Sequence, residues 1–292
     1  MTALLFGVSA LLVLLALIII SAWAFQEKIA FQPERPPYPA AGNTTRVEYR
    51  AADGQPLFAY VVGDPRQSAG LVLAFHGNAD LAVRQIDWAR EISNRTGFAV
   101  MLPEYRGYMG LEGKPTYAGS RLDAAAAYTF ATQALGASAD RFVFFGHSLG
   151  SAIAAELAVE HLPRSLILEA PFTSARDMAA LFGGSWFTSG VWPAISRLHF
   201  DTIGIVASLD IPVSVSHGGR DVVIPFRMGQ EVYDAAKKKG EWLFVPSAAH
   251  SDIREAGGQQ YWDWLTRSLQ QIDPNETGHG LSHALLISMQ LF

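Results

Sequence analysis

The chain has 292 residues, of which 17% are charged and 50% hydrophobic, and its formal net charge is −5. This length suits one large α/β domain or two small ones, because domains typically run to about 100–200 residues. The acidic balance argues against a nucleic-acid binder, which would carry a basic patch. The absence of cysteine excludes a disulfide framework, a thiol nucleophile and any cysteine-ligated metal site. It does not fix the compartment, since such chains occur on either side of a membrane.

Residues 1–26 predict a transmembrane anchor. The run 3–25 is apolar throughout, and no charged side chain precedes Glu27. As a helix it would be about 34 Å long, enough to cross about 30 Å of hydrocarbon. A core helix is a weaker interpretation, because it would have to be apolar on every face. A cleaved signal peptide stays open, with Ala22-Trp23-Ala24 as a small-x-small site, although the run is long and lacks a basic start.

The residues that follow the anchor predict its orientation and a linker. Lys28 and Arg35 follow the apolar run, and no basic residue precedes it. Because cytoplasmic flanks carry an excess of positive charge, this places the bulk of the protein on the cytoplasmic side. Residues 27–44 contain a proline-rich stretch at 32–39, which predicts an extended linker rather than a helix.

Residues 45–272 alternate between short apolar runs and helix-length stretches. Eight runs predict strands, at 45–50, 57–62, 71–75, 98–102, 142–145, 166–168, 213–216 and 242–245. Five stretches predict helices, at 81–95, 121–134, 151–161, 227–238 and 259–271. This alternation, after an initial hairpin-like pair, predicts an α/β fold in which helices flank a mostly parallel eight-stranded sheet.

One segment, residues 171–210, interrupts the alternation. It separates two predicted strands by far more than an ordinary connection, which predicts a functional insertion such as a cap. Its large aromatic residues either line a site for an apolar acyl chain or pack the cap onto the body; they are Phe172, Phe182, Trp186, Phe187 and Trp192. Residues 273–292 are interpreted as a loosely attached C-terminal tail.

Residues 146–150, Gly-His-Ser-Leu-Gly, match the G-x-S-x-G pattern of a nucleophile elbow. They follow the predicted strand 142–145 and precede a stretch rich in small residues, which is the strand–turn–helix context of such elbows. The glycines allow a strained turn, and the helix N-terminus favours negative charge that develops at the serine. A pattern this short also arises by chance, so the context carries the prediction that Ser148 is a nucleophile.

A serine nucleophile needs a base and an acid that orients the base. Asp221 follows the predicted strand 213–216, and His250 follows the strand 242–245. Both lie just beyond strand C-termini, where catalytic groups gather in open α/β sheets. Each has an ordinary alternative role, as a turn aspartate or a capping histidine. Their order after Ser148 is the one expected of a nucleophile–acid–base triad in this fold class, so we predict those roles.

Two backbone N–H groups are expected to stabilise the oxyanion. Leu149, the residue after the nucleophile, supplies one of them. The loop after the predicted strand 71–75 supplies the other, which we assign to Asn78, with Ala79 as the alternative. Loss of one such donor lowers rates on the order of 10²–10³-fold. This chemistry requires no metal and no organic cofactor.

These residues resemble a known family, the α/β-hydrolases, and more narrowly its membrane-anchored group whose animal members include protein depalmitoylases. The strings that carry the resemblance are 75–79 (FHGNA), 103–108 (PEYRGY), 146–150 (GHSLG), 169–174 (EAPFTS) and 217–221 (HGGRD), with His250 beyond them. The resemblance covers about residues 45–272 and implies the α/β-hydrolase fold and the same triad. Leu111 stands where a serine is usual, which puts the polar contacts of that loop in doubt. Glu169, also at a strand end, is an alternative acid that fits the spacing less well.

The predicted function is a membrane-anchored serine hydrolase that cleaves carboxylic ester or thioester bonds through an acyl-enzyme on Ser148. The anchor and the aromatic cap favour a lipid-like acyl substrate. Two alternatives stay open, a serine peptidase on the same fold and a non-catalytic binding protein, because this fold hosts many functions. Neither the oligomeric state nor the natural substrate follows from the sequence.

Overall fold

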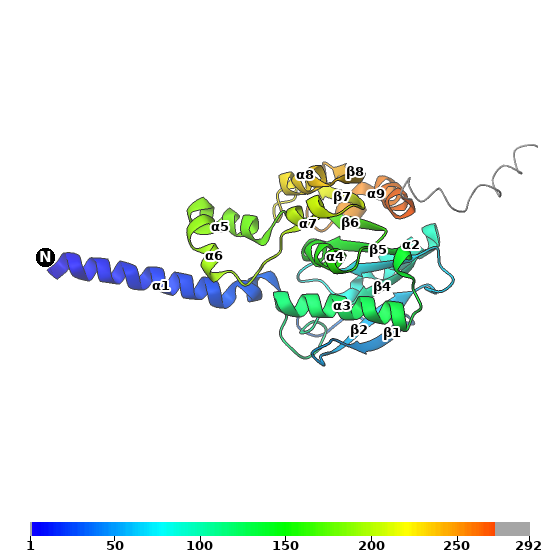
Figure 1. Ribbon diagram of the computed structural model, residues 1–292, viewed down its shortest axis with the longest axis horizontal. Coiled ribbons are helices and arrows are strands. Elements are labelled where there is room, and N and C mark those ends of the chain that lie inside the picture. The colour runs from blue at the N-terminus through cyan, green and yellow to red at the C-terminus, as the bar shows by residue number, and fades with distance from the viewer. Residues whose placement is uncertain (1, 272–292) are drawn as a thin grey trace, which may run out of the picture.

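The computed structural model describes residues 2–271, and a sheet of eight strands forms its centre (Figure 1). The strands lie in the order β1-β2-β4-β3-β5-β6-β7-β8. Their bounds are β1 (Thr45–Arg50), β2 (Pro56–Val62), β3 (Leu71–Phe75), β4 (Ala99–Pro103), β5 (Phe142–His147), β6 (Ser165–Glu169), β7 (Pro212–Gly218) and β8 (Lys238–Val245). β2 pairs antiparallel with β1 and β4, and the other neighbours are parallel. The predicted mostly parallel eight-stranded sheet is confirmed.

Helices cover both faces of this sheet. Those of the body are α2 (Ile86–Thr96), α3 (Tyr117–Gln133), α4 (Leu149–Glu160), α7 (Thr202–Ser208), α8 (Phe226–Ala235) and α9 (Ile253–Gln270), with 3₁₀ turns at Ala82–Gln85 and Ala139–Arg141. On one face, α3 packs against α4, α4 against α7, and α7 against α8, so these four helices form one layer. On the other face, α2 and α9 pack together. β3, β4 and β6 are buried along their whole length, as expected of strands covered on both faces.

The predicted boundary between the helix 227–238 and the strand that follows it is wrong. The expected helix 227–238 ends at Ala235, and Lys238 instead begins β8. Lys238 pairs with Pro212 and Lys239 with Val213, so this lysine-rich segment extends the parallel ladder at the sheet edge. Pairing with β7 therefore outweighs the helix propensity of lysine, which is a weak local preference.

α1 (Thr2–Ala30) is one continuous helix that projects from the body (Figure 1). Within it, residues Val13–Ala30 are long and apolar enough to cross a membrane, and only 6% of this window is buried. The interpretation as a core helix therefore fails. α1 also continues four residues (27–30) into the predicted linker, where its last turns contact the insertion after β6.

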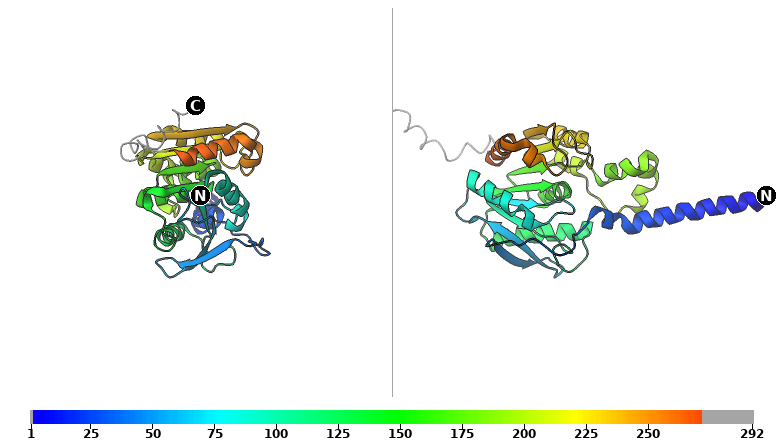
Figure 2. Two further views of the ribbon diagram at one scale, coloured as in Figure 1. Left: turned by 90° about the vertical axis from the view of Figure 1, so that its right-hand side faces the viewer. Right: turned by 180° about the vertical axis from the view of Figure 1, so that it is seen from behind.

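The insertion between β6 and β7 has two parts. α7 joins the helical layer of the body, whereas α5 (Ala175–Gly190) and α6 (Trp192–Ile195) lie beside α1, away from the sheet (Figures 1 and 2). We call α5 and α6 the cap hairpin. The predicted tail, residues 273–292, lies outside the described residues, and so does the side chain of Trp186.

Candidate active site

Ser148 lies at the turn between β5 and α4, with φ 52° and ψ −118°. This is a left-handed backbone conformation that residues other than glycine rarely adopt. The turn is so tight that a Cβ on Gly146 would overlap the carbonyl oxygen of Gly150, and one on Gly150 would overlap that of Phe75. The predicted strand–turn–helix context is therefore present, and both glycines are required by close backbone approach.

His250 joins Ser148 to Asp221. Its Nε2 lies 2.9 Å from Ser148 Oγ, and its Nδ1 lies 2.7 Å from Asp221 Oδ2. The three side chains come from the loops after β5, β7 and β8, so the C-terminal edge of the sheet brings them together. A proton on Nδ1 donates to the carboxylate and leaves Nε2 to accept the proton of the serine hydroxyl.

Asp221 is held in one orientation and in its charged form. Its Oδ1 accepts hydrogen bonds from the backbone N–H groups of Val223 and Ile224, each at 2.8 Å. His217 Nε2 lies 3.0 Å from the Ile224 carbonyl oxygen and 3.3 Å from Asp221 Oδ2, so it donates to both acceptors. Burial raises the pKa of Asp221, but hydrogen bonds from His217 and His250 more than offset it and hold that pKa well below its ordinary value. The carboxylate is therefore ionised at neutral pH.

Glu169, the alternative acid, has a different partner. Its Oε1 lies 3.2 Å from Arg254 Nε, and the Arg254 guanidinium lies 4.4 Å from the centroid of the Trp88 ring. Burial raises the pKa of Glu169, and the positive charge of Arg254 more than offsets it, so this pKa falls below its ordinary value. Glu169 is thus buried and pairs with the partly exposed Arg254, while Asp221 contacts the imidazole of His250.

His147 was not among the predicted site residues. Its ring centroid lies 5.2 Å from that of His250, and its Nε2 donates to the His250 carbonyl oxygen at 3.2 Å. Burial lowers the pKa of His147, which favours the neutral ring. The side chain of His147 therefore supports the loop that carries His250. No sequence signal indicated this, because the position lies at a variable site of the G-x-S-x-G pattern.

The loop after β3 passes beside Ser148. A Cβ built on Gly77 would lie 3.4 Å from the Cβ of Ser148. The Asn78 N–H donates to no other group of residues 2–271, whereas the N–H of Ala79, the alternative donor, donates to Asn78 Oδ1 at 2.9 Å. The N–H of Leu149 opens α4 and therefore precedes the first intrahelical hydrogen bond. The geometry thus favours Asn78 over Ala79 as the partner of Leu149.

Buried hydrogen bonds hold this loop from below. His76 Nε2 lies 2.8 Å from Glu104 Oε1, and Nδ1 lies 2.8 Å from the Gly77 carbonyl oxygen. Burial lowers the pKa of His76, but the charge of Glu104 outweighs it and the pKa is raised. Tyr105 OH donates to the His76 carbonyl oxygen at 2.9 Å. Both ring nitrogens of His76 are therefore used in supporting the loop.

The segment after α1 also reaches this loop. The Gln32 N–H donates to Asn78 Oδ1 at 2.6 Å, and Tyr108 OH donates to the same oxygen at 3.2 Å. The neighbouring Phe31 is buried, with its ring centroid 6.5 Å from that of Phe200. The sequence predicted only a linker here, because nothing in its pattern pairs residue 32 with residue 78.

The cap aromatics fall into different environments. Phe172 is buried against Phe200, with ring centroids 6.2 Å apart, and Phe187 packs with Trp192 at the same distance. Phe182 is 87% exposed, so it neither lines a cavity nor packs onto the body. The two predicted roles of these aromatics therefore do not account for Phe182.

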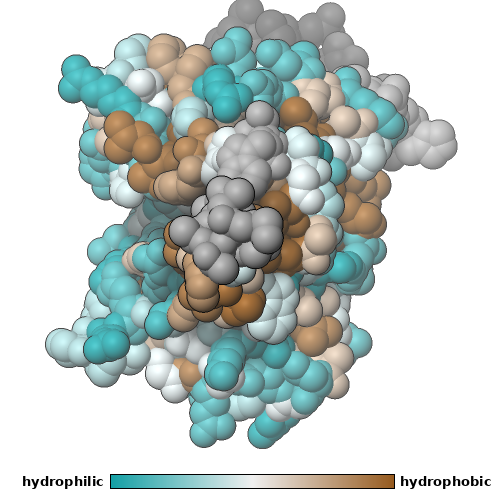
Figure 3. Space-filling model, turned by 90° about the vertical axis from the view of Figure 1, so that its left-hand side faces the viewer, coloured by the Kyte–Doolittle hydropathy of each residue, from teal (hydrophilic) through white to brown (hydrophobic). Residues whose placement is uncertain are grey.

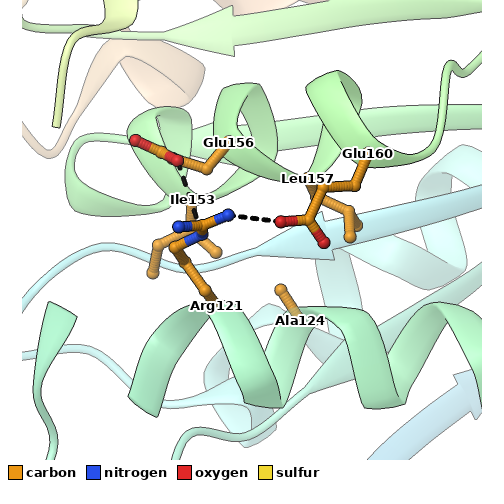
Figure 4. A pocket seen from close by; sticks show the side chains of 6 residues that line it. All are labelled: Arg121, Ala124, Ile153, Glu156, Leu157 and Glu160. Carbon is orange, nitrogen blue, oxygen red and sulfur yellow. Dashed lines mark hydrogen bonds and ion pairs between the residues drawn. The ribbon is translucent and has the colours of Figure 1, made fainter. Parts of the chain in front are cut away.

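Two small hollows are lined by residues other than Ser148, Asp221 and His250. One lies between α3 and α4 (Figure 4), where Arg121 pairs with Glu156 and Glu160. The other lies beneath the site and is lined in part by His147 and Arg254. Within residues 2–271, no group of three or more histidine, aspartate or glutamate side chains is arranged to hold a metal ion.

Comparisons with known proteins show several relatives. A family model described as "Serine aminopeptidase, S33" matches residues 66–202. An uncharacterised protein of Mycobacterium tuberculosis is 30% identical over 264 residues, covering 87% of this chain and 90% of the relative. The α/β hydrolase domain-containing protein WAV2 of Arabidopsis thaliana is 29% identical over 277 residues, with the same coverage. The lysophosphatidylserine lipase ABHD12 of Danio rerio is 31% identical over 189 residues, covering 59% of this chain and 48% of the relative.

Proposed function

Since the chain belongs to the α/β-hydrolase superfamily, we propose that it is a serine hydrolase that cleaves carboxylic esters or thioesters through an acyl-enzyme on Ser148. The observation that carries this proposal is the hydrogen-bonded series from Ser148 Oγ through His250 to Asp221, at 2.9 and 2.7 Å. Both distances allow direct proton transfer.

The mechanism follows from these positions. Ser148 Oγ attacks the carbonyl carbon while His250 Nε2 accepts the hydroxyl proton. The electron pair of the C=O bond moves to oxygen, which the N–H groups of Asn78 and Leu149 stabilise. The C–O or C–S bond then breaks, and His250 returns the proton to the departing alkoxide or thiolate. Water, activated by the same imidazole, attacks the acyl-enzyme and releases the carboxylic acid and free Ser148.

The proposal includes a membrane anchor at residues 1–26 and a catalytic domain at 45–272. Support for the anchor comes from the exposed apolar side chains of α1, among them Leu17 and Ile20. Lys28 and Arg35 favour a catalytic domain on the cytoplasmic side. The mass of the purified chain tests the anchor against a cleaved leader, because cleavage after Ala24 would remove the span.

The ester assignment has support from one relative, and the peptidase alternative from another comparison. ABHD12 is named as a lipase, and a lysophospholipid carries a carboxylic ester. The matching family model is described as an aminopeptidase, which keeps peptide bonds as the second candidate substrate. Both reactions use the same triad, so only substrate trials separate them.

The first experiment is labelling by a fluorophosphonate probe on the full-length protein in detergent. Ser148→Ala should abolish labelling, whereas Ser151→Ala, one turn further along α4, should retain it. Labelling that survives in Ser148→Ala would overturn the assigned nucleophile. A panel of p-nitrophenyl esters, acyl thioesters and aminoacyl anilides then follows. Hydrolysis confined to the anilides would replace the esterase proposal by the peptidase.

A further inference from the structure

α1 and the cap hairpin each contain a long segment without charged side chains. In α1, no Asp, Glu, Lys or Arg precedes Glu27. In the cap hairpin none occurs at residues 178–196, which lie between Asp177 and Arg197. Glu27 and Arg197 form an ion pair of 2.6 Å. The two uncharged segments therefore begin at the same level.

Specific contacts fix the cap hairpin against α1 at this level. Gln26 Nε2 donates to the Ile195 carbonyl oxygen at 2.8 Å, and Gln26 Oε1 accepts from the Arg197 N–H at 2.6 Å. Gln26 is buried by these contacts. The Arg197 guanidinium also lies 5.6 Å from the centroid of the Trp23 ring. The orientation of the hairpin along the anchor is thus set by hydrogen bonds and charge.

The part of the hairpin just before its kink, which we call the apex, carries large exposed apolar side chains. Leu181 is 42% and Phe182 is 87% exposed. The chain then departs from helical geometry at Gly184, with φ 70° and ψ 177°. Figures 1 and 2 show α5 and α6 alongside the last turns of α1. In Figure 3, which views the molecule from the anchor side, apolar side chains are concentrated near the middle of the view and hydrophilic ones make up most of the periphery.

We propose that residues 178–196 are a second membrane-inserted element, seated in the same leaflet as the C-terminal part of α1. This inference rests on the proposed membrane anchor. The bilayer surface lies at the level of the Glu27–Arg197 pair, which stays in water while Leu181 and Phe182 enter the boundary of headgroups and acyl chains. Each arm of the hairpin is far shorter than the about 20 residues that a span needs. The element is therefore interfacial, at a depth of about 5–10 Å.

This placement deepens the proposed function by naming the source of the substrate. The insertion leaves the sheet at the C-terminal end of β6, and the neighbouring β5 ends at the nucleophile. The Ser148 N–H donates to the Glu169 carbonyl oxygen at 2.9 Å, so the root of the insertion adjoins the site. The substrate class is then a long-chain acyl ester or thioester that resides in the leaflet and enters beside the hairpin.

The absence of cysteine makes the test direct, because each single-cysteine variant carries one label. Full-length Phe182→Cys is labelled with an environment-sensitive fluorophore and reconstituted in vesicles of phosphatidylcholine and phosphatidylglycerol. Ile18→Cys, in α1, is the control for the anchor. Leu162 follows the end of α4 and is 58% exposed. Leu162→Cys is therefore the matched control for a label that replaces an apolar side chain and stays in water. Iodide in the buffer and doxyl-labelled lipids serve as quenchers.

We expect iodide to quench the labels at positions 18 and 182 at least about threefold less than the label at position 162. Doxyl lipids should quench the labels at positions 18 and 182. Shielding at 18 with full iodide access at 182 overturns the inference and leaves the anchor in place. Iodide access at both 18 and 182 overturns the anchor as well. The two failures are therefore distinguishable.

A functional measurement complements the depth measurement. The double variant Leu181→Asp/Phe182→Asp should hydrolyse a long-chain ester in vesicles at least about tenfold more slowly, because carboxylates exclude the apex from the interface. Hydrolysis of water-soluble p-nitrophenyl butyrate in detergent should change by less than about twofold, because neither side chain contacts the triad. Equal rates on vesicles, or equal losses on both substrates, would contradict a role in membrane seating.

Discussion

The backbone amide of Gln32 lies 2.6 Å from the side-chain oxygen of Asn78. Gln32 is two residues beyond the end of α1, and Asn78 is the proposed second oxyanion donor. The same oxygen accepts from Tyr108 OH and from the Ala79 N–H. The conformation of the loop beside Ser148 therefore depends on the segment that follows α1.

Gln32→Pro should lower kcat for p-nitrophenyl butyrate by about tenfold. Proline removes the N–H that holds Asn78, and one such hydrogen bond contributes about 0.5–1.5 kcal/mol. Gln32→Ala keeps the N–H and is the matched control, so it should stay within about twofold of the wild type. Steady-state kinetics in detergent, with the thermal midpoint as a folding check, measure the difference. Equal kcat values for the two variants would show that the amide does not position the loop.

Asp221→Asn should lower kcat by about 10⁴-fold, because an amide no longer fixes the tautomer in which His250 Nε2 accepts a proton. Glu169→Gln is the control, since Glu169 pairs with Arg254 instead. It should keep kcat within about tenfold but lower the thermal midpoint, because Arg254 is then left without its counter-charge. If Glu169→Gln showed the larger loss of kcat, the assignment of the acid would have to be reversed.

The depressed pKa of Asp221 predicts a pH-dependent contribution to stability. The folded protein keeps this carboxylate ionised at pH values where the unfolded chain, with an ordinary pKa of about 3.9, binds a proton. The contribution is therefore present above about pH 4 and is lost as the pH falls through the folded pKa. Urea unfolding at pH 7, 5 and 3.5 should show that the stability gap between wild type and Asp221→Asn narrows at the lowest pH. A gap independent of pH would argue against the ionised state described above.

Gly146→Ala should prevent folding, because the new Cβ overlaps the backbone of Gly150 and costs more than about 4 kcal/mol. Gly190→Ala, where a Cβ would have nothing within 4 Å, should leave the thermal midpoint unchanged or raise it slightly. The yield of soluble detergent-extracted protein and its thermal midpoint measure both effects. A well-folded Gly146→Ala variant would mean that the turn is less tight than described.

Most of the sheet could be predicted because buried parallel strands are continuous apolar runs that stand out from their surroundings. The proximity of Ser148, Asp221 and His250 has a related origin in the sequence: each follows such a run, and the ends of parallel strands share one edge. The boundary between α8 and β8 could not be predicted, because the lysines at the start of β8 gain their strand conformation only from pairing with β7.

The support of the site was not predictable from local pattern. His147 donates one hydrogen bond from its ring to His250, and Gln32 donates one from its backbone to Asn78. Both partners lie far away in the chain. Hydrogen bonds of this kind leave no periodicity in a sequence. The sequence identifies Phe182 as one of the aromatic residues of the insertion. Its exposure could not be predicted, because it depends on the direction in which the cap hairpin leaves the body.

The backbone of Ser148 has a further consequence for how this chain balances folding against chemistry. Its φ of 52° would suit glycine better than serine, and such a conformation costs a non-glycine residue about 1–3 kcal/mol. Ser148→Gly should therefore be inactive yet more heat-resistant than Ser148→Ala, which retains the strained Cβ. A position where the residue without a hydroxyl is the more stable one would reveal a trade-off: the fold accepts a strained backbone at the residue that carries the proposed nucleophilic oxygen.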